Sequence, residues 1–203
     1  MKPNLTRRVA LILAEKLNFY TKKEGLAFTK MELGMEVFLV NISKIIIMYL
    51  LATLIGVLWQ TIAIHFAFAL IKRYSFGAHA LNSMVCTAIC CFAFVIIPWL
   101  LLDIGINNFG VVAVFTTVIF ILYLYAPADT KAKPLVGKGL RLQLKNKALI
   151  CGFALMLVAL LVPSQSLKLL LALGAIFQCV AILPITYKIL KRSERNYEKY
   201  EKA

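Results

Sequence analysis

The sequence predicts an all-α integral membrane protein, with about six transmembrane helices, an N-terminal amphipathic helix and both termini in the cytoplasm. Of the 203 residues, 62% are apolar and 16% are charged, whereas soluble domains carry roughly 25% charged residues. The apolar run IIIMYLLATLIGVLWQTIAIHFAFALI is longer than the roughly 20 residues that one membrane crossing requires. The basic residues form separate clusters between these apolar runs.

The positions of the basic clusters predict the topology. The formal net charge is +14, and positive charge is scarce between the clusters, which are residues 1–30, the pair Lys72 and Arg73, residues 131–147 and residues 188–202. Because Lys and Arg tend to remain in the cytoplasm, each stretch between two clusters should cross the membrane an even number of times. We therefore expect three helical hairpins.

The N-terminal region predicts a helix that lies on the membrane surface. Apolar residues recur every three or four positions in residues 4–20, with Arg and Lys between them. Such a helix fits the inner leaflet, where its basic residues meet anionic lipid. Charged residues follow without a small-residue cleavage signature, so we do not expect a removable signal peptide.

The remaining elements are predicted from the lengths of the apolar runs. Residues 37–71 allow two short helices that meet near Gly56, although Asn41, Ser43 and Lys44 also fit a tilted, interfacial or re-entrant piece. Pro127 is expected to end the helix before it. The other predicted elements are a helix at 81–102, an outer turn at 103–108, and helices at 109–126, 148–162 and 168–187. The chain is expected to form one domain, with a cytoplasmic-face region at 1–36, a bundle at 37–187 and a basic tail at 188–203.

One histidine and one cysteine lie at the predicted cytoplasmic end of the third span. His79 and Cys86 are the minimum pair for nucleophilic acyl transfer, in which imidazole takes the thiol proton and the thiolate attacks a carbonyl. On a continuous helix they would lie about 10.5 Å apart along the axis, too far for a hydrogen bond. We therefore expect the chain to turn near Gly77 and Asn82, with Cys86 early in a helix, where the positive helix end favours the thiolate.

Other interpretations of these residues remain open. Cys90, Cys91, Cys151 and Cys179 fit packing positions, and the absence of a second clustered histidine and of a CxxC pair argues against zinc. A small transporter or peptide exporter would also have six basic-inside spans, but it should carry interacting polar groups at mid-membrane, where His65 is the main candidate. A structural or sensor-anchoring protein is the third class.

Two stretches of the chain resemble a known family. FGAHALNSMVC at 76–86 and YAPADTKAKPL at 125–135 are similar to the two best recognised stretches of the accessory gene regulator protein B (AgrB) family, which are membrane cysteine endopeptidases of Gram-positive quorum sensing. The chain length, basic N-terminus and helix count agree with that family. The resemblance implies that His79 is the catalytic histidine and Cys86 the nucleophile.

The resemblance also implies a substrate and partners. The substrate would be an AgrD-like propeptide, whose acidic C-terminal tail is removed while a thiolactone or lactone ring forms. Arg73, Lys131 and Lys133 are the nearest candidate contacts for that tail, although basic residues beside a membrane also serve topology and lipid binding. Further candidates lie behind them: Lys138, Arg141, Lys145 and Lys147. The family implies no metal or other cofactor and leads us to expect a homodimer at the cell membrane, with no nucleic-acid partner. The motif does not fix a third catalytic residue; the polar candidates are Glu36, Ser75, Asn82, Ser83 and Asp129.

Overall fold

The computed structural model describes residues 5–78, 83–130, 134–193 and 196–201. Every regular element in these residues is helical. The chain divides into two compact units, residues 1–51 and 52–203, and each unit is described by itself.

The first unit contains α1 (Leu5–Thr21) and most of α2 (Gly25–Ile55). The amphipathic N-terminal helix is thus confirmed. Asn18 closes the turn between the two helices, because its side chain accepts from the Lys23 N–H at 2.7 Å and donates to the Lys23 carbonyl at 3.0 Å. The α2 helix begins well before the predicted residue 37, since the intervening segment is rich in helix-forming Leu, Ala, Met and Glu.

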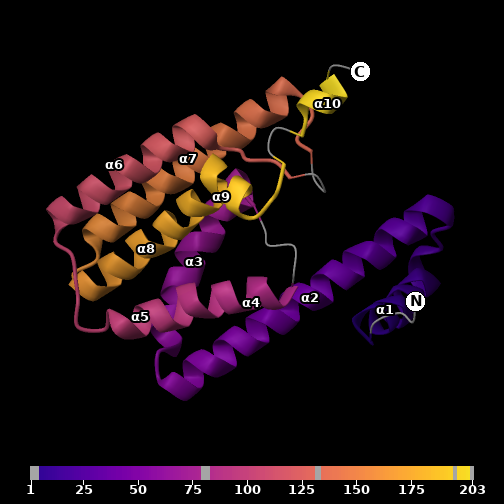
Figure 1. The fold of residues 1–203 in the computed structure, drawn as a ribbon, viewed down its shortest axis with the longest axis horizontal. Coiled ribbons are helices and arrows are strands. Elements are labelled where there is room, and N and C mark those ends of the chain that lie inside the picture. Colours follow the sequence, from indigo (N-terminus) through magenta and orange to yellow (C-terminus); the bar gives the residue numbers. More distant parts are fainter. Residues whose placement is uncertain (1–4, 79–82, 131–133, 194–195, 202–203) are drawn as a thin grey trace. The chain divides into compact units, whose positions relative to one another are not determined.

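The second unit is built around four helices that share one apolar core. They are α3 (Leu58–Ser75), α6 (Asn108–Tyr125), α7 (Lys138–Leu161) and α8 (Gln165–Ile182), and Figure 1 shows α6, α7 and α8 side by side. Ile71, Phe115, Leu122 and Ile182 are buried in this core. The turn that precedes α3 is at Gly56, where φ is +83°, so the predicted meeting point of the first two spans is confirmed.

The α3 and α8 helices pack closely against each other, and a glycine makes this possible. A Cβ atom added at Gly174 would lie 2.4 Å from the Ile64 carbonyl oxygen and 2.7 Å from the Ala67 Cβ. Small residues allow such close backbone approach in membrane helices. The position of α8 on α3 therefore depends on the absence of a side chain at residue 174.

The predicted span at 81–102 is helical but irregular. It consists of α4 (Ser83–Cys91), a π-helical segment η1 (Phe92–Ile96) and α5 (Ile97–Leu100). Pro98 has no N–H to donate to the preceding turn, and the Phe94 carbonyl instead accepts from the Thr61 hydroxyl of α3 at 2.7 Å. Such replacement of a missing backbone bond by a neighbouring hydroxyl is what allows proline inside membrane helices.

The C-terminal part of the chain differs most from the prediction. The last long helix ends at Ile182 and not at 187, because Leu183 takes extended geometry before Pro184, which begins the short helix α9 (Pro184–Ile189). The α7 helix begins at Lys138, ahead of the predicted residue 148. The predicted tail contains one further short helix, α10 (Glu198–Glu201).

Five helical stretches within the described residues are long and apolar enough to cross a membrane: Gly25–Ile55, Ser83–Leu100, Asn108–Tyr125, Lys138–Leu161 and Gln165–Ile182. The class of all-α membrane protein is therefore confirmed. The α3 helix, which the sequence predicts as one of six spans, is not among the five. Its Gln60, His65, Lys72 and Arg73 lower its hydropathy, even though it lies in the centre of the second unit.

Candidate active site

Cys86 lies in the first turn of α4, where its side chain is only 9% exposed. It lines a cavity of about 440 Å³ that is formed by α3, the α4 and η1 segment, α8 and α9. Apolar groups form most of the wall, among them Phe68, Phe94 and Phe177. Ala78, the residue before His79, lines the same cavity. The α3 helix ends at Ser75, and α4 begins at Ser83.

Lys72 brings a positive charge to the wall of this cavity. Its ammonium nitrogen lies 4.6 Å from the centroid of the Phe68 ring, one helical turn earlier on the same face of α3. The predicted substrate residue Arg73 points elsewhere: it is exposed, and its guanidinium carbon lies 5.8 Å from the centroid of the Tyr74 ring. Successive helical residues diverge by about 100°, so only Lys72 of this basic pair lines the cavity.

The segment that leads to His79 is held by backbone hydrogen bonds from two distant parts of the chain. The Gly77 N–H donates to the Ala128 carbonyl at 3.1 Å, and the Ala128 N–H donates to the Ser75 carbonyl at 2.9 Å. The Ala78 N–H donates to the Ala181 carbonyl of α8 at 2.9 Å. The two recognised stretches, 76–86 and 125–135, are therefore paired directly in the fold.

Glycine is required at the centre of this segment. Gly77 has a φ of +124°, and a Cβ atom there would lie 2.9 Å from the Ala181 carbonyl oxygen. An L side chain would therefore meet both an unfavourable backbone conformation and the backbone of α8. This explains why the turn predicted near Gly77 occurs at that residue.

Gln178 of α8 is a fully buried polar residue that sequence reasoning missed. Its amide nitrogen donates to the Ser75 hydroxyl at 2.7 Å and to the Phe76 carbonyl at 2.5 Å. Because a carbonyl can only accept, the Phe76 contact fixes the orientation of the amide. Its amide oxygen has no partner among the described residues. The only signal in the sequence is one glutamine in the apolar run AIFQCVAI.

Several predicted residues lie outside the described residues: His79, Lys131, Lys133 and the turn candidate Asn82. Ser75 and Asp129 are both buried and hydrogen-bonded to the protein. Ser83 begins α4, and Glu36 belongs to the first unit.

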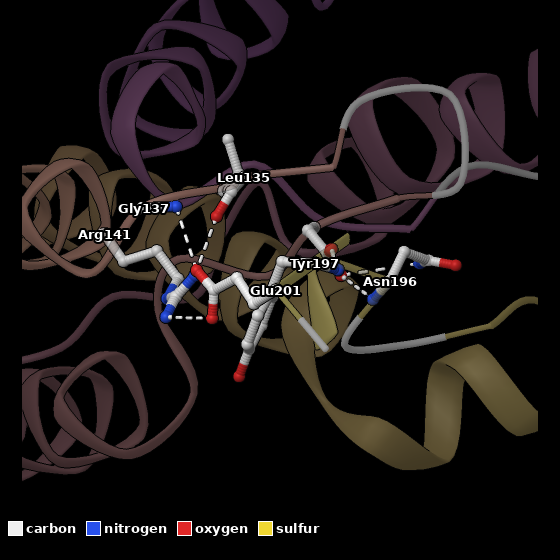
Figure 2. A network of polar contacts seen from close by, with 7 residues as sticks. Leu135, Gly137, Arg141, Asn196, Tyr197 and Glu201 are labelled. Carbon is white, nitrogen blue, oxygen red and sulfur yellow. Dashed lines mark hydrogen bonds and ion pairs between the residues drawn. The ribbon is translucent and has the colours of Figure 1, made fainter. Parts of the chain in front are cut away.

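Asp129 connects the 125–135 stretch to the C-terminal tail. It is 3% exposed, and its two carboxylate oxygens accept from the backbone N–H groups of Asn196 at 3.0 Å and Tyr197 at 2.9 Å. The hydroxyl of Tyr187 donates to its carbonyl at 2.8 Å. Figure 2 shows Asn196 and Tyr197 near an ion pair between Arg141 and Glu201.

The five cysteines are all described, and none forms a disulfide bond. No group of three or more His, Cys, Asp or Glu within the described ranges could hold a metal ion. Cys86 and Cys90 line the cavity described above, whereas Cys151 lies on α7 and lines no part of it.

These features define a small membrane protein with a buried thiol beside an apolar cavity, and comparison with known proteins gives its family. The sequence model of the Accessory gene regulator B (AgrB) family matches residues 6–182. An AgrB-like protein of Listeria innocua is 40% identical over 200 residues, which are 98% of this chain and 97% of that protein. An AgrB-like protein of Clostridium acetobutylicum is 38% identical over 202 residues, covering 100% and 97% of the two chains.

Accessory gene regulator protein B of Staphylococcus intermedius is 34% identical over 184 residues, which are 90% of this chain and 94% of that protein. No solved structure matches the chain significantly. The chain belongs to the AgrB family, and with it to the accessory gene regulator system of quorum sensing. The suspected resemblance is thereby confirmed.

Proposed function

We propose that this chain is a cysteine endopeptidase that removes the acidic C-terminal tail of an AgrD-like propeptide and closes the remaining peptide into a thiolactone or lactone ring. The observation that carries this proposal is the shared cavity. Cys86 and Ala78, the neighbour of His79, line one cavity, and hydrogen bonds from Ala128 and Ala181 hold the segment that ends at Ala78. These contacts place Ala78 at the wall of the cavity that Cys86 also lines.

The first chemical step forms an acyl-enzyme. His79 takes the proton from the Cys86 thiol, and the thiolate attacks the carbonyl carbon of the peptide bond before the tail. Lys72 and the N-terminal end of α4 supply positive potential near the sulfur, which supports the thiolate. When the peptide bond breaks, His79 returns its proton to the leaving amine, and the new bond is a thioester to Cys86.

The second step releases a ring. His79 takes the proton from an internal thiol or hydroxyl of the propeptide, which attacks the thioester carbonyl. A new thiolactone or lactone bond forms, and the Cys86 thiolate leaves. Water must be excluded, because hydrolysis would give a linear peptide. The apolar wall of the cavity, including Phe68, Phe94 and Phe177, supports this exclusion. A nucleophile held in the same molecule also has a large effective concentration over water.

The overall exchange has little driving force of its own. An amide is more stable than a thioester, so the free energy of the cleaved tail and ring is not much below that of the propeptide. The reaction is therefore reversible, and removal of a product must draw it forward. Added tail peptide is expected to slow ring formation.

We further propose the placement in the cell that the sequence predicts. Both termini and the catalytic pair lie at the cytoplasmic face of the cell membrane, basic residues contact anionic lipid, and the protein forms a homodimer. The basic clusters support the orientation.

The test is intact-protein mass spectrometry of the purified protein with its cognate propeptide. Wild type should gain a mass equal to the N-terminal part of the propeptide, and the Cys86→Ala variant should not. The His79→Ala variant should form the adduct much more slowly. The Cys151→Ala variant is a matched control, because this half-buried cysteine lies on α7 outside the cavity and should retain the adduct.

The proposal fails if Cys86→Ala cleaves the propeptide at the wild-type rate, or if folded, membrane-inserted wild type leaves the propeptide intact. In the second case the exporter and scaffold classes would take precedence. If wild type cleaves the propeptide but no adduct is detected, the intermediate should be trapped with hydroxylamine, which converts a thioester to a hydroxamate. Absence of the hydroxamate would then exclude the acyl-enzyme.

A further inference from the structure

The C-terminal segment places a carboxylate in a site formed by α7 and the segment before it. The Arg141 guanidinium donates two hydrogen bonds to the Glu201 carboxylate, Nη1 to Oε1 at 2.7 Å and Nη2 to Oε2 at 3.2 Å (Figure 2). The Gly137 N–H donates to the same Oε1 at 2.9 Å. One carboxylate thus accepts three hydrogen bonds, two of them in the paired geometry that arginine favours. We call Arg141 and the Gly137 N–H the carboxylate clamp.

The clamp is held in shape by groups other than Glu201. Arg141 Nη1 also donates to the Leu135 carbonyl at 3.0 Å, and the guanidinium carbon lies 3.9 Å from the centroid of the Tyr197 ring. Gly137 has a φ of +102°, a conformation that L side chains rarely adopt, and it is the N-cap residue that precedes α7. The N–H groups at the start of a helix and its dipole both favour an anion there. Most of the clamp would therefore remain in place after a carboxylate leaves.

Glu201 can leave this site at low cost. Its side chain is 29% exposed and that of Arg141 is 17% exposed, and ion pairs near solvent contribute little net stability. The clamp is also next to a cavity of about 270 Å³ lined by Asp129, Arg141 and Tyr197, which gives an incoming segment room. Glu201 is therefore a removable occupant.

The clamp is physically continuous with the candidate active site. Asp129 holds the backbone of Asn196 and Tyr197, and Asp129 follows Ala128, whose backbone pairs with Gly77 and Ser75. The same short segment, 126–129, thus contacts both the tail that carries Glu201 and the loop that leads to His79. A peptide bound at the clamp would lie along this segment.

We infer that the clamp binds a carboxylate of an acidic peptide, and that Glu201 of the chain's own tail occupies it as a built-in competitor. The inference rests on the proposed function, in which the substrate carries an acidic tail. An acidic segment that displaces Glu201 gains the three hydrogen bonds that Glu201 gives up. The tail thereby raises the concentration of acidic peptide needed for half-saturation and favours segments with several carboxylates.

Binding of a synthetic acidic peptide tests the inference without any cleavage. The probe is a fluorescein-labelled Gly-Ser-Glu-Glu-Glu-Glu peptide, its reference is the same peptide with Gln for Glu, and the protein is the full chain in phosphatidylcholine nanodiscs. All variants also carry Cys86→Ala, so the measured anisotropy reports binding alone. While Glu201 occupies the clamp, the apparent affinity for the probe is reduced in proportion to the fraction of protein whose clamp is free. Glu201→Ala should therefore bind the Glu probe about fivefold more tightly than wild type. This factor corresponds to the free energy of one exposed ion pair.

The controls separate the clamp from net charge. Glu24→Ala removes the same charge in the first unit and should not change the affinity. Arg141→Gln should weaken the Glu probe severalfold and should cancel the gain from Glu201→Ala when the two are combined. Arg141→Lys keeps the charge but not the paired geometry, and should restore only part of the affinity.

Two results would overturn the inference. One is equal affinity of wild type and Glu201→Ala for the Glu probe, which would make the ion pair a structural attachment of the tail. The other is an equal increase in affinity for the Glu probe with Glu24→Ala, or with Glu201→Ala when Arg141→Gln is also present. Either result would show that the affinity depends on the net charge of the protein and not on the clamp. If wild type cleaves no propeptide but Glu201→Ala still binds the Glu probe about fivefold more tightly, the proposed function is disproved and the inference that the clamp binds a carboxylate is supported.

Discussion

Replacement of Gln178 by Leu should separate stability from catalysis. The two side chains have similar volume, but Leu cannot donate to Phe76 and Ser75. Two lost hydrogen bonds cost about 1 kcal/mol each. The same change removes the buried amide oxygen of Gln178, which has no partner among the described residues, and burying such a group unpaired costs about 1 to 3 kcal/mol. The two effects oppose each other, so the free energy of unfolding should change by less than about 2 kcal/mol.

Catalysis should respond more strongly than stability to this change. The loop before His79 keeps its backbone bonds to Ala128 and Ala181 but loses the hydrogen bonds from the Gln178 side chain to Ser75 and Phe76. A displacement of a catalytic group by about 1 Å costs roughly 100-fold in rate. We therefore expect kcat for propeptide cleavage to fall by about 10-fold to 100-fold, with KM changed by less than about threefold.

The assay is steady-state cleavage of the propeptide in detergent, read by mass spectrometry, beside thermal unfolding of the same preparations. Gln143→Leu is the matched control, because Gln143 is exposed on α7, and it should leave both measurements near those of wild type. A kcat within threefold of wild type for folded Gln178→Leu would refute the view that Gln178 positions the loop. A large fall in thermal stability with the same kcat per folded molecule would show that its role is structural.

Three further predictions concern packing and charge. Gly174→Ala should lower the free energy of unfolding by more than about 2 kcal/mol, because overpacking costs about 1 to 3 kcal/mol and here the obstacle is largely backbone; thermal unfolding measures it. Thr61→Val should cost about 1 to 3 kcal/mol in the same assay, since the buried Phe94 carbonyl loses its donor. The hydrogen bonds from Arg141 and Gly137 lower the pKa of the Glu201 carboxyl. Attachment of the tail through Glu201 should therefore be complete above the usual carboxyl pKa and should be lost as the pH falls below it. Hydrogen exchange of the tail measures this change.

Each of these predictions has a matched control. Gly139→Ala should be nearly neutral, because nothing lies within 4 Å of a Cβ there. Thr117→Val should cost little, since this exposed hydroxyl donates only to the Ala113 carbonyl of its own helix. In Glu201→Gln, protection of the tail, measured relative to the intrinsic exchange rate, should lose the part of its pH dependence that comes from Glu201, while Asp129 still holds Asn196 and Tyr197. Equal losses in a variant and its control, or an unchanged pH dependence, would contradict the corresponding explanation.

Much of the fold could be predicted because apolar length and helix-breaking residues act locally. The amphipathic periodicity predicts α1, Gly56 marks the end of α2, and Pro127 marks the end of α6. The end of α8 was missed for a reason that is also local: Pro184 breaks a run that hydropathy alone continues to 187. The prediction sets the starts of α2 and α7 too late, because it treats segments rich in basic residues as loop, although Lys and Arg are good helix formers.

Part of the candidate site could also be predicted from the sequence, and part could not. The residue types of His79 and Cys86 and the family resemblance predict the proposed chemistry from the sequence, and the two recognised stretches identify the family. The sequence does not predict that Lys72 and not Arg73 faces the cavity, because one residue of helical rotation decides it. Gln178 lies about 100 residues from the loop that it contacts, so no local pattern connects them.

The sequence by itself therefore determined the class, the family and most helix positions, and it supplied the candidate reacting pair, since these follow from composition, from short-range geometry and from motif residues. The tertiary structure decided which segments meet. It paired 76–78 with 128 and 181, replaced the carbonyl partner lost at Pro98 by Thr61, and folded the tail onto Asp129 and Arg141. These contacts join residues far apart in the chain, and they exist only because helix packing brings unsatisfied backbone and charged groups together where they must find partners.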